Sequence, residues 1–404
     1  MSANPIAPMF SPAFVDDPYP TYRHHLQGPS AQVLNAQRGY WAVFRYAQCL
    51  AMLREPRLSS RRPASVIVHA PEDEIPEFEP LISHMGRWLL LRDAPSHTAL
   101  RRALNRGFSP AVIESLRPRV EAIVARLLDG MEDRGEADIV KDLAYPLPVT
   151  VICDLLGVPE SQHGRCVELT NVIAAWFANV PRTPDIARPA QAAVLELVEI
   201  FKDLLARRTD RTRRDLLDLL LDIADREPDL TREELHAQCV MLLFGGHETT
   251  RHWIGNSVYT FLRHPDALEE IRKNPDLVKG AMEEVLRFES PVQMFSRTAA
   301  APIEVEGAVI PAGSSVFIVI AAAQRDGDQF PEPDRFDPLR SHLRHLAFGG
   351  DAHVCLGSTL ARLEGQIAVR ELIKRFPRLQ ATESTVRWSR FMGFRGLEQL
   401  PVRL

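Results

Sequence analysis

A single cysteine in a glycine-bearing loop constrains this chain more than any other feature. The loop runs from Phe348 to Gly357 and carries Cys355 just before a stretch, Ser358 to Arg375, that is predicted to be a helix. Backbone N–H groups and the positive end of that helix would stabilise the sulfur as a thiolate. Such a thiolate can bind a metal or attack a substrate. The alternative is a buried small hydrophobe, which is what most free cysteines are.

The spacing in this loop resembles the haem-binding loop of the cytochromes P450, Phe-Gly-x-Gly-x-His/Arg-x-Cys-x-Gly. The loop matches that pattern at Phe348, Gly349, His353, Cys355 and Gly357. The resemblance implies that Cys355 is the axial ligand of haem b iron, with Phe348 and Gly357 packed beside the macrocycle. An axial thiolate donates electron density to the iron and favours O–O cleavage. Asp351 stands where the family usually has glycine, and aspartate tolerates a left-handed backbone better than most residues.

A second motif lies within a long predicted helix. Gly245 and Gly246 stand in mid-helix, where each glycine costs about 1 kcal/mol against alanine. They make either a notch, which Thr249 shares because it is four residues from Gly245, or a close helix crossing. The segment resembles the family's oxygen-activating motif. The resemblance implies that Gly245 borders the cofactor, that Thr249 hydrogen-bonds bound dioxygen, and that Glu248 helps to relay protons from solvent.

Four basic side chains form a candidate set for binding an anionic group. His97 and Arg101 lie one helical turn apart, so both can face the same group. The alternative is an exposed basic face of the helix, because Arg102 and Arg106 continue the run of basic residues. The resemblance implies that the haem propionates accept charge-assisted hydrogen bonds from His97, Arg101, Arg297 and His353.

Glu284 and Arg287 are three residues apart on a predicted helix. An exposed pair at this spacing would contribute only about 0.5 kcal/mol. The resemblance implies instead a structural ion pair behind the haem, with Arg335 as its third partner. We interpret this trio as scaffold and not as catalytic machinery.

The substrate would lie over the haem, on the side opposite Cys355. The resemblance assigns its lining to segments that here contain many aromatic and methionine side chains, which favours a roomy apolar pocket. Each side chain alone is equally consistent with an ordinary core position. The candidates are Met85, Trp88, Trp176, Phe177, Phe244, Gln293, Met294, Phe295, Phe391 and Met392, with His247 and Arg390 as further polar groups.

The remaining pattern predicts a mainly α protein with small β-sheets. Helical periodicity dominates between about residues 90 and 290 and again at 355–376. Strand patterns occur at 31–60, 300–322 and 380–404, and we expect them to form one β-rich region. Because the resemblance runs from about Pro18 to Leu404, residues 1–404 are expected to form a single domain with the cytochrome P450 fold.

Composition excludes several function classes. The net charge of −5 offers no basic field for nucleic acid. Five scattered cysteines without a CxxC pair do not support zinc ribbons or redox dithiols. The start of the chain lacks the pattern of a secretory signal, and no run of about 18 apolar residues predicts a membrane span. We therefore expect a soluble cytoplasmic protein.

The motifs together predict a haem-thiolate monooxygenase that hydroxylates or epoxidises a hydrophobic small molecule, as in secondary-metabolite biosynthesis. The resemblance implies electrons from NAD(P)H through a separate ferredoxin and ferredoxin reductase, with an acidic carrier docking near Arg102, Arg106 and Arg362. Two alternatives remain: the same fold performing oxidative coupling or another non-hydroxylating oxidation, and a non-catalytic haem-binding protein. The intact Glu248–Thr249 pair disfavours the second.

Overall fold

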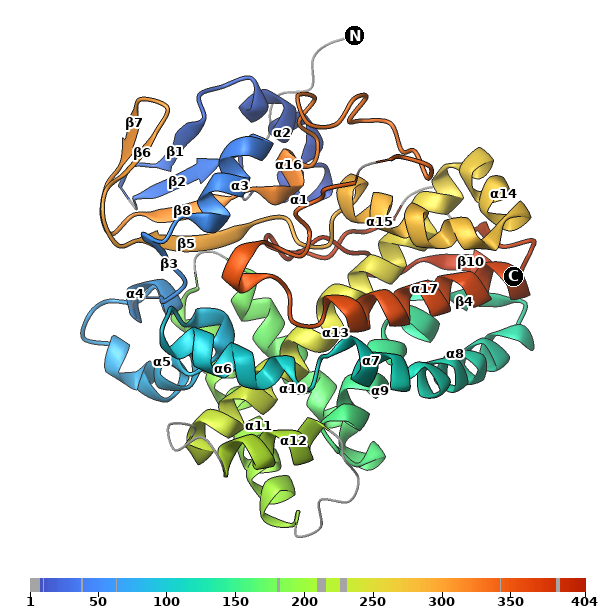
Figure 1. Cartoon of the computed structure of the whole chain (residues 1–404), viewed down its shortest axis with the longest axis horizontal. Coiled ribbons are helices and arrows are strands. Elements are labelled where there is room, and N and C mark those ends of the chain that lie inside the picture. Colours follow the sequence, from blue (N-terminus) through green and yellow to red (C-terminus); the bar gives the residue numbers. More distant parts are fainter. Residues whose placement is uncertain are drawn as a thin grey trace.

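The chain folds into a mainly helical body with a small mixed sheet on one side, as the sequence patterns predict (Figure 1). This computed structural model describes residues 8–9, 11–37, 39–62, 64–179, 182–208, 216–225, 231–341, 343–382 and 386–404. Its α-helices are α1 (Pro12–Asp16), α2 (Tyr19–Leu26), α3 (Tyr46–Arg54), α4 (Ala64–Ile67), α5 (Glu79–Gly86), α6 (Ser96–Asn105), α7 (Pro110–Ser115), α8 (Arg117–Glu132), α9 (Pro146–Leu155), α10 (Glu160–Phe177), α11 (Pro184–Ala206), α12 (Leu216–Ala224), α13 (Arg232–Arg263), α14 (Pro265–Lys273), α15 (Val278–Phe288), α16 (Ile320–Ala323) and α17 (Ser358–Arg375).

Short 3-10 or π turns join several of these helices. They are η1 (Ile75–Phe78), η2 (Leu89–Leu91), η3 (Val140–Ala144), η4 (Pro275–Leu277) and η5 (Asp351–His353). The strands are β1 (Ala31–Asn35), β2 (Tyr40–Val43), β3 (Leu58–Ser59), β4 (Glu136–Asp138), β5 (Phe295–Ala299), β6 (Ile303–Val305), β7 (Ala308–Ile310), β8 (Ser315–Ile318), β9 (Gln380–Ala381) and β10 (Pro401–Arg403).

The long helix α13 crosses the centre of the helical body and organises the packing around it (Figure 1). Its N-terminus is closed by a capping box, in which the Glu234 N–H donates to the Thr231 hydroxyl at 3.2 Å and the Thr231 N–H donates to the Glu234 carboxylate at 3.1 Å. Helices α9, α11, α15 and α17 pack against α13. Most of its residues between Leu235 and Phe261 are buried, so α13 is a core helix almost throughout.

Helix α17 begins at Ser358 and ends at Arg375, so the helix predicted after the cysteine loop is confirmed. It packs against both α13 and α8. This packing fixes the end of the cysteine loop against the helical body, beside the central helix.

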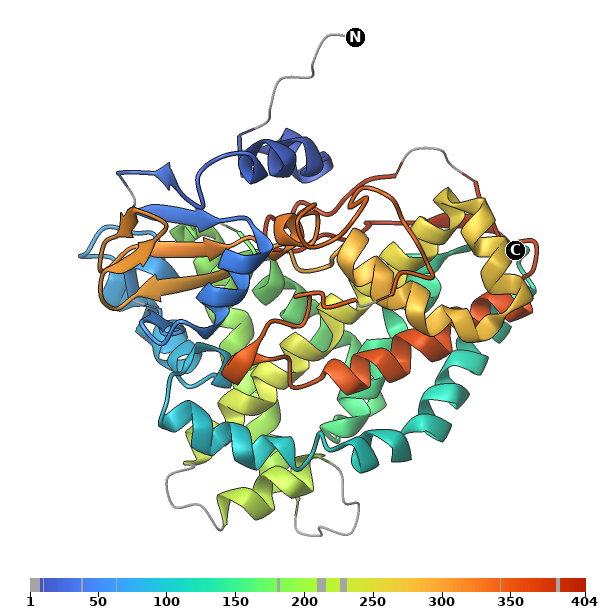
Figure 2. The same cartoon turned by 45° about the horizontal axis from the view of Figure 1, so that its top comes forward.

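The larger sheet has the strand order β1-β2-β8-β5-β3. Strands β2 and β8 are parallel, whereas the other neighbouring pairs are antiparallel. Arg297 on β5 lies opposite Val316 on β8, which places this predicted cofactor ligand on an inner strand. Helices α1 and α2 lie on the outer side of the sheet and do not enter the helical body (Figure 2).

The C-terminal strands do not join this sheet, so the prediction of one β-rich region that includes residues 380–404 is wrong. Strand β10 pairs with β4 on one side and with β9 on the other, in a separate sheet. In Figure 1 this sheet lies at the opposite end of the molecule from β1 and β2. A strand of three residues gives no sequence signal of its partner, because pairing is decided by tertiary packing.

The strand pattern predicted at 300–322 begins with a hairpin of β6 and β7. The turn residues Glu306 and Gly307 have φ values of 46° and 87°. Two consecutive positive φ angles are what a tight two-residue hairpin turn requires, and glutamate is an unusual residue there.

Glu284 and Arg287 form the predicted buried ion pair, but the prediction of Arg335 as its third side-chain partner is wrong. Arg287 donates to both Glu284 oxygens at 2.7 and 2.8 Å, and the Arg340 Nε donates to one of them at 3.1 Å. The Arg335 guanidinium instead pairs with Glu332 at the surface. Arg335 contributes only its carbonyl, which accepts hydrogen bonds from both arginines.

Among the described residues, no single helix is long and apolar enough to cross a membrane. Two consecutive segments, Val140–Leu155 and Glu160–Phe177, are long and apolar enough for a membrane span only when taken together, and they meet at a bend of 114°.

Candidate active site

The Cys355 loop is shaped by two residues in the left-handed backbone region. Gly349 has φ of 73° and Asp351 has φ of 53°, so aspartate adopts the conformation that it tolerates better than most side chains. The Cys355 N–H donates to the Phe348 carbonyl at 2.8 Å, which closes the loop. The Gly357 N–H is directed at the Cys355 sulfur, as expected for a backbone that stabilises a thiolate.

Cys355 is set apart from the other four cysteines, Cys49, Cys153, Cys166 and Cys239, which are buried and free. Its side chain is exposed, yet burial raises the pKa of its thiol, against the opposing effects of the Gly357 N–H, Arg101 and Arg362. A residue that is reachable by solvent and still surrounded by protein lines an internal space. Cys355 is therefore placed to ligate a group within the fold, whereas the structural alternative of a packed hydrophobe does not fit.

The two glycines of α13 have different roles. A Cβ on Gly246 would lie 2.7 Å from Ile152 Cγ1, so this glycine permits the close crossing of α13 and α9. A Cβ on Gly245 would meet nothing within 4 Å, and Gly245 is exposed although Phe244 and His247 beside it are buried. Both readings of the glycine pair are thus correct, one for each glycine, and Gly245 borders an open space inside the body.

Glu248 is buried among three basic side chains of its own helix. Its carboxylate lies 2.9 Å from Arg251 Nη2, 3.1 Å from His252 Nε2 and 3.8 Å from His247 Nε2. Burial alone would raise the pKa of the Glu248 carboxyl, but these neighbours outweigh it and lower the pKa to about 2. Glu248 is therefore ionised at neutral pH. The neighbouring Thr249 is only half-buried, and its hydroxyl makes no hydrogen bond to the part of the chain that the structure describes.

The predicted anion-binding residues come together from three separate elements. The rings of His97 on α6 and His353 in the cysteine loop lie 4.1 Å apart, and Arg297 on β5 and Arg101 on α6 act electrostatically on both. Burial, with these cationic neighbours, lowers the pKa of His353 to about 3 and lowers that of His97. The buried Nε2 of His97 has no hydrogen-bond partner among the described residues.

These observations fit haem. A set of basic groups with an unpartnered buried nitrogen matches a cofactor with carboxylate side groups. The solvent-reachable Cys355 and the open space beside Gly245 match a flat macrocycle bound between the cysteine loop and α13. Phe348 packs under this loop, with its ring against Trp253 of α13 and beneath the Arg362 guanidinium.

One basic residue was missed in the sequence. Arg62 follows β3 and donates to the Ser296 carbonyl, the same oxygen that accepts a hydrogen bond from Arg297. Burial lowers the pKa of Arg62 well below its ordinary value, as do the nearby charges of Arg297 and Arg182. No motif marks Arg62, because it stands in a loop whose course depends on tertiary contacts.

Several of the predicted substrate-lining residues form one aromatic cluster. Trp88, Phe177 and Phe244 lie with ring centroids 5.2 to 6.3 Å apart, although they come from three distant segments. Trp176 contacts Phe177 at 6.1 Å. Met85 is fully buried in the main core, where it packs as an ordinary core residue would.

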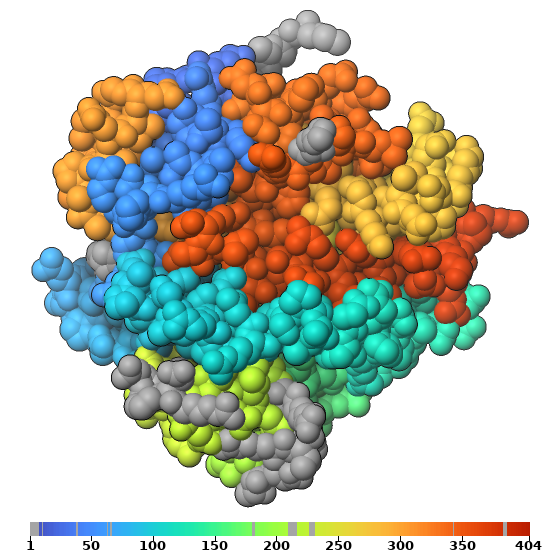
Figure 3. All heavy atoms as spheres, viewed as in Figure 1, coloured from blue at the N-terminus to red at the C-terminus, as the bar shows by residue number. Residues whose placement is uncertain are grey.

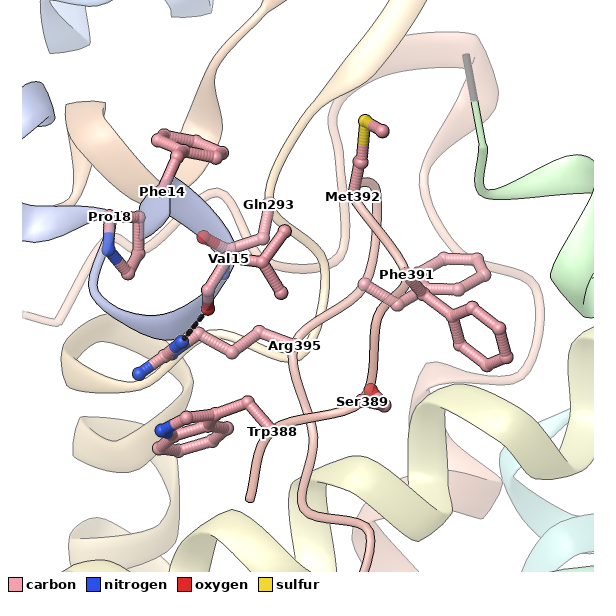
Figure 4. A pocket seen from close by; sticks show the side chains of 10 residues that line it. Phe14, Val15, Pro18, Gln293, Trp388, Ser389, Phe391, Met392 and Arg395 are labelled. Carbon is pink, nitrogen blue, oxygen red and sulfur yellow. Dashed lines mark hydrogen bonds between the residues drawn. The ribbon is translucent and has the colours of Figure 1, made fainter. Parts of the chain in front are cut away.

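The other predicted substrate-lining residues lie in different parts of the structure. Gln293, Phe391 and Met392 line one small cavity next to α1, shown in Figure 4. The Gln293 amide is already occupied, because its oxygen accepts from the Tyr22 hydroxyl at 2.7 Å and its nitrogen donates to the Ser290 carbonyl at 2.7 Å.

Met294 and Phe295, although adjacent in the chain, contact two different parts of the structure. Met294 packs on the hydrophobic cluster beneath α1 and α2. Phe295 instead reaches the cysteine loop, with its ring edge 3.6 Å from where a Cβ on Gly349 would stand.

Comparison with known proteins agrees with this geometry. A family model described as Cytochrome P450 matches residues 69–392. The chain is 38% identical to the cytochrome P450 monooxygenase PikC of Streptomyces venezuelae, with 96% of this chain and 92% of PikC covered. It is 36% identical to 6-deoxyerythronolide B hydroxylase of Saccharopolyspora erythraea, with 98% of each chain covered.

A solved structure with the same single-domain fold has a TM-score of 0.88 and 33% identity, covering 98% of this chain and all of the other. It is P450BioI in complex with an acyl carrier protein ligated to hexadec-9Z-enoic acid.

Proposed function

We propose that this chain, which belongs to the cytochrome P450 family, hydroxylates an apolar natural product at a site formed by Cys355, Thr249 and the aromatic cluster. The chain is a haem-thiolate monooxygenase, and it takes electrons from NAD(P)H through redox partners. The observation that best supports the assigned site is Cys355, the exposed cysteine in a loop whose backbone N–H faces its sulfur.

Haem b, when bound, supplies the iron at which dioxygen is activated. The residues of the chain that would hold it are Cys355 at the iron, and His97, Arg101, Arg297 and His353 at the propionates. Gly245 leaves the room that the macrocycle needs beside α13, and Phe348 and Gly357 support the loop around the sulfur. Together these residues would hold the cofactor between the cysteine loop and α13.

Proton delivery is the proposed task of Thr249 and Glu248. The Thr249 hydroxyl is half-buried and free of protein partners in the described chain, so it can donate to a group bound beside Gly245. The ionised Glu248 carboxylate accepts a proton from the solvent side and passes it towards Thr249 Oγ1. Arg251, whose side chain is 14% exposed, connects that carboxylate to the surface.

Hydroxylation is the reaction that the relatives favour over oxidative coupling, because two of them are named as a monooxygenase and a hydroxylase. The aromatic cluster of Trp88, Phe177 and Phe244 supports an apolar substrate held against the central helix.

The redox partner is proposed to be a ferredoxin, reduced by a ferredoxin reductase in the cytoplasm. Figure 3 shows the face on which α6, α7 and α8 adjoin the segment that contains α17. Arg102 on α6 and Arg106, which follows that helix, are exposed and suit an acidic carrier. Arg362 is less available, because Glu283 binds its guanidinium at 2.8 and 2.9 Å.

The proposed reaction is tested by turnover. The purified holoenzyme, supplied with NADPH, a surrogate ferredoxin and its reductase, should form an oxygenated product from at least one member of a broad library of apolar natural products. Absence of turnover across the library, with the ferredoxin shown to reduce the protein, would favour a non-catalytic haem-binding protein.

Thr249→Ala should retain haem but separate oxygen consumption from product formation. Without the Thr249 hydroxyl, proton transfer to the reaction centre is no longer directed. The amount of product formed per NADPH consumed should therefore fall about 10-fold or more. Thr249→Ser keeps the hydroxyl and should restore most of the coupling. Full coupling in Thr249→Ala, measured from NADPH, oxygen and product together, would contradict the assigned role.

Gly245→Leu should fill the space beside α13 and lower the haem content of a folded protein. The measurement is haem absorbance per protein, together with circular dichroism. Gly164→Leu is the matched control, because Gly164 is also helical with nothing within 4 Å of an added Cβ, but lies exposed on α10. Equal haem content in the two variants would show that Gly245 does not border the cofactor.

A further inference from the structure

The two oxygens of the Glu248 carboxylate have different surroundings. Arg251 Nη2 and His252 Nε2 make their closest approaches to Oε1, at 2.9 and 3.1 Å. His247 Nε2 approaches Oε2 instead, at 3.8 Å, which is too long for a hydrogen bond. One oxygen is therefore held more closely than the other, within a side chain that is buried.

His247, one of the polar groups that the sequence offers for orienting a substrate, is already engaged. Its Nδ1 lies 2.9 Å from the Leu243 carbonyl, which can only accept a hydrogen bond. Burial lowers the pKa of the His247 imidazole, so the ring is neutral at pH 7 and its single proton lies on Nδ1. The other nitrogen, Nε2, then carries a lone pair and lies 3.4 Å from the Thr170 hydroxyl. His247 therefore has no proton to donate to Glu248 Oε2.

His252 presents a proton to the other carboxylate oxygen. Its side chain is buried, and burial together with the charge of Arg251 lowers the pKa of the imidazole, so this ring is also neutral at pH 7. An ionised carboxylate oxygen only accepts hydrogen bonds, which places the ring proton on Nε2, opposite Glu248 Oε1. The two atoms are close but not aligned as a hydrogen bond in this structure, and contacts of this kind commonly align only when substrate is bound.

Gly396 fixes the His252 ring from the other side. A Cβ on Gly396 would lie 1.6 Å from His252 Nδ1 and 2.2 Å from its Cγ. The backbone φ of Gly396 is not in the left-handed region, so the position requires the missing side chain and not a special conformation. Two hydrogen bonds hold this segment in place: the Ser389 N–H donates to the Gly396 carbonyl at 2.8 Å, and Asn256 Nδ2 donates to the Arg395 carbonyl at 2.9 Å. The ring is thus enclosed between Glu248 and the C-terminal segment.

We propose that His252 is a positioning residue of the proton relay, and that Gly396 provides the space that its ring occupies. Arg251 supplies the permanent charge that keeps Glu248 ionised, and His252 fixes the direction of Oε1. Oε2 is then the oxygen that takes up a proton from the solvent side and passes it to Thr249 Oγ1. This inference rests on the proposed function, because it assigns how Glu248 is held in that relay.

The proton balance of this relay leaves the positioning residues unchanged. As Thr249 Oγ1 receives the proton from Glu248 Oε2, the hydroxyl gives its own proton to the reaction centre. Glu248 returns to the carboxylate form, and no bond to His252 or Arg251 is made or broken.

The first test measures the product formed per NADPH consumed by the haem-loaded protein. The reaction contains the surrogate ferredoxin, its reductase and the library member that gives the most product. His252→Leu should lower this ratio about 5- to 10-fold, the effect of losing one hydrogen bond to a charged group. His252→Gln keeps an N–H at a similar reach and should restore most of the ratio. His236→Leu is the matched control, because His236 is a buried histidine in the N-terminal part of the same helix.

A solvent isotope effect separates positioning from general support of the fold. When the same reactions run in D2O, product formation by His252→Leu should slow more than that of the unmodified protein, because proton delivery has become limiting. The carbon monoxide spectrum and the haem content of this variant should stay as in the unmodified protein.

The second test uses the contact between Gly396 and the His252 ring. Gly396→Ala should displace the ring and lower the ratio of product to NADPH as His252→Leu does. In a protein that already carries His252→Ala, Gly396→Ala should cause no further loss, because the ring that it would displace is absent. Gly86→Ala is the matched control, because an added Cβ there would meet nothing within 4 Å.

Several results would overturn the inference. An unchanged ratio in His252→Leu, with Glu248→Gln uncoupled, would refute the role of His252 alone. Equal losses in His252→Gln and His252→Leu would show that the N–H is not what matters, and additive losses from Gly396→Ala and His252→Ala would show that the glycine acts elsewhere. Loss of the carbon monoxide band in His252→Leu would make that histidine a residue of the fold. Full coupling in Glu248→Gln would refute the proposed relay as well.

Discussion

Glu284→Gln is expected to lower the free energy of unfolding by about 3–5 kcal/mol, one of the two largest effects that the structure predicts. Glu284 and Arg287 are fully buried, and the carboxylate accepts from Arg287, from Arg340 and from the Asp337 N–H at 3.2 Å. The glutamine would leave the Arg287 charge buried without an anion. It would also place an NH2 donor at one of the two carboxylate oxygens, which together now accept four hydrogen bonds.

The measurement is the midpoint of denaturant unfolding for the haem-loaded protein. Glu332→Gln is the matched control, because it removes an exposed ion pair with Arg335 at 3.0 Å and should change stability by less than about 1 kcal/mol. Equal midpoints for the two variants would contradict the view that the buried pair is a structural centre of the fold.

This same ion pair shows what sequence reasoning reached and where it stopped. The spacing of Glu284 and Arg287 on one helix is a local property, and the pair forms as predicted. The third partner comes from a loop, where Glu332 has a positive φ of 48° and the chain turns so that Arg340 faces inward while Arg335 faces solvent. Which of two nearby arginines points inward depends on that turn, and no residue pattern encodes it.

The central helix and the cysteine loop were the most predictable parts of the fold. The capping box at Thr231, the mid-helix glycines and the loop before α17 are each written within a few neighbouring residues. The pairing of β10 with β4 was not predictable, because it joins segments more than 260 residues apart through strands of three residues. Long-range pairing is decided by packing and not by local preference.

The position of Arg62 was likewise invisible in the sequence. Arg62 stands in a loop, next to no recognisable motif. Its position follows from the Ser296 carbonyl, which accepts hydrogen bonds from both Arg62 and Arg297. By contrast, the predicted polar candidate Gln293 faces Tyr22 and the N-terminal helices, which no pattern in its own segment indicates.

Cys355→Ala is expected to abolish both the thiolate-ligated haem spectrum and turnover, the second large effect. Cys355 is the only exposed cysteine in the described chain, so no other thiol among those residues is placed to replace it. Cys239→Ala is the matched control, because Cys239 is a fully buried cysteine of the central helix and should retain both properties. Loss of product formation in the first variant and not in the second, under identical electron supply, would assign the function to this sulfur.

The most direct test of the central claim is the absorption spectrum of the reduced protein under carbon monoxide. Iron with an axial thiolate should give the red-shifted Soret band of the family, because the sulfur donates electron density to the metal. We predict this band for the unmodified protein and for Cys239→Ala, and its absence in Cys355→Ala. An unmodified protein without the band, or a Cys355→Ala variant that keeps it, would contradict the account.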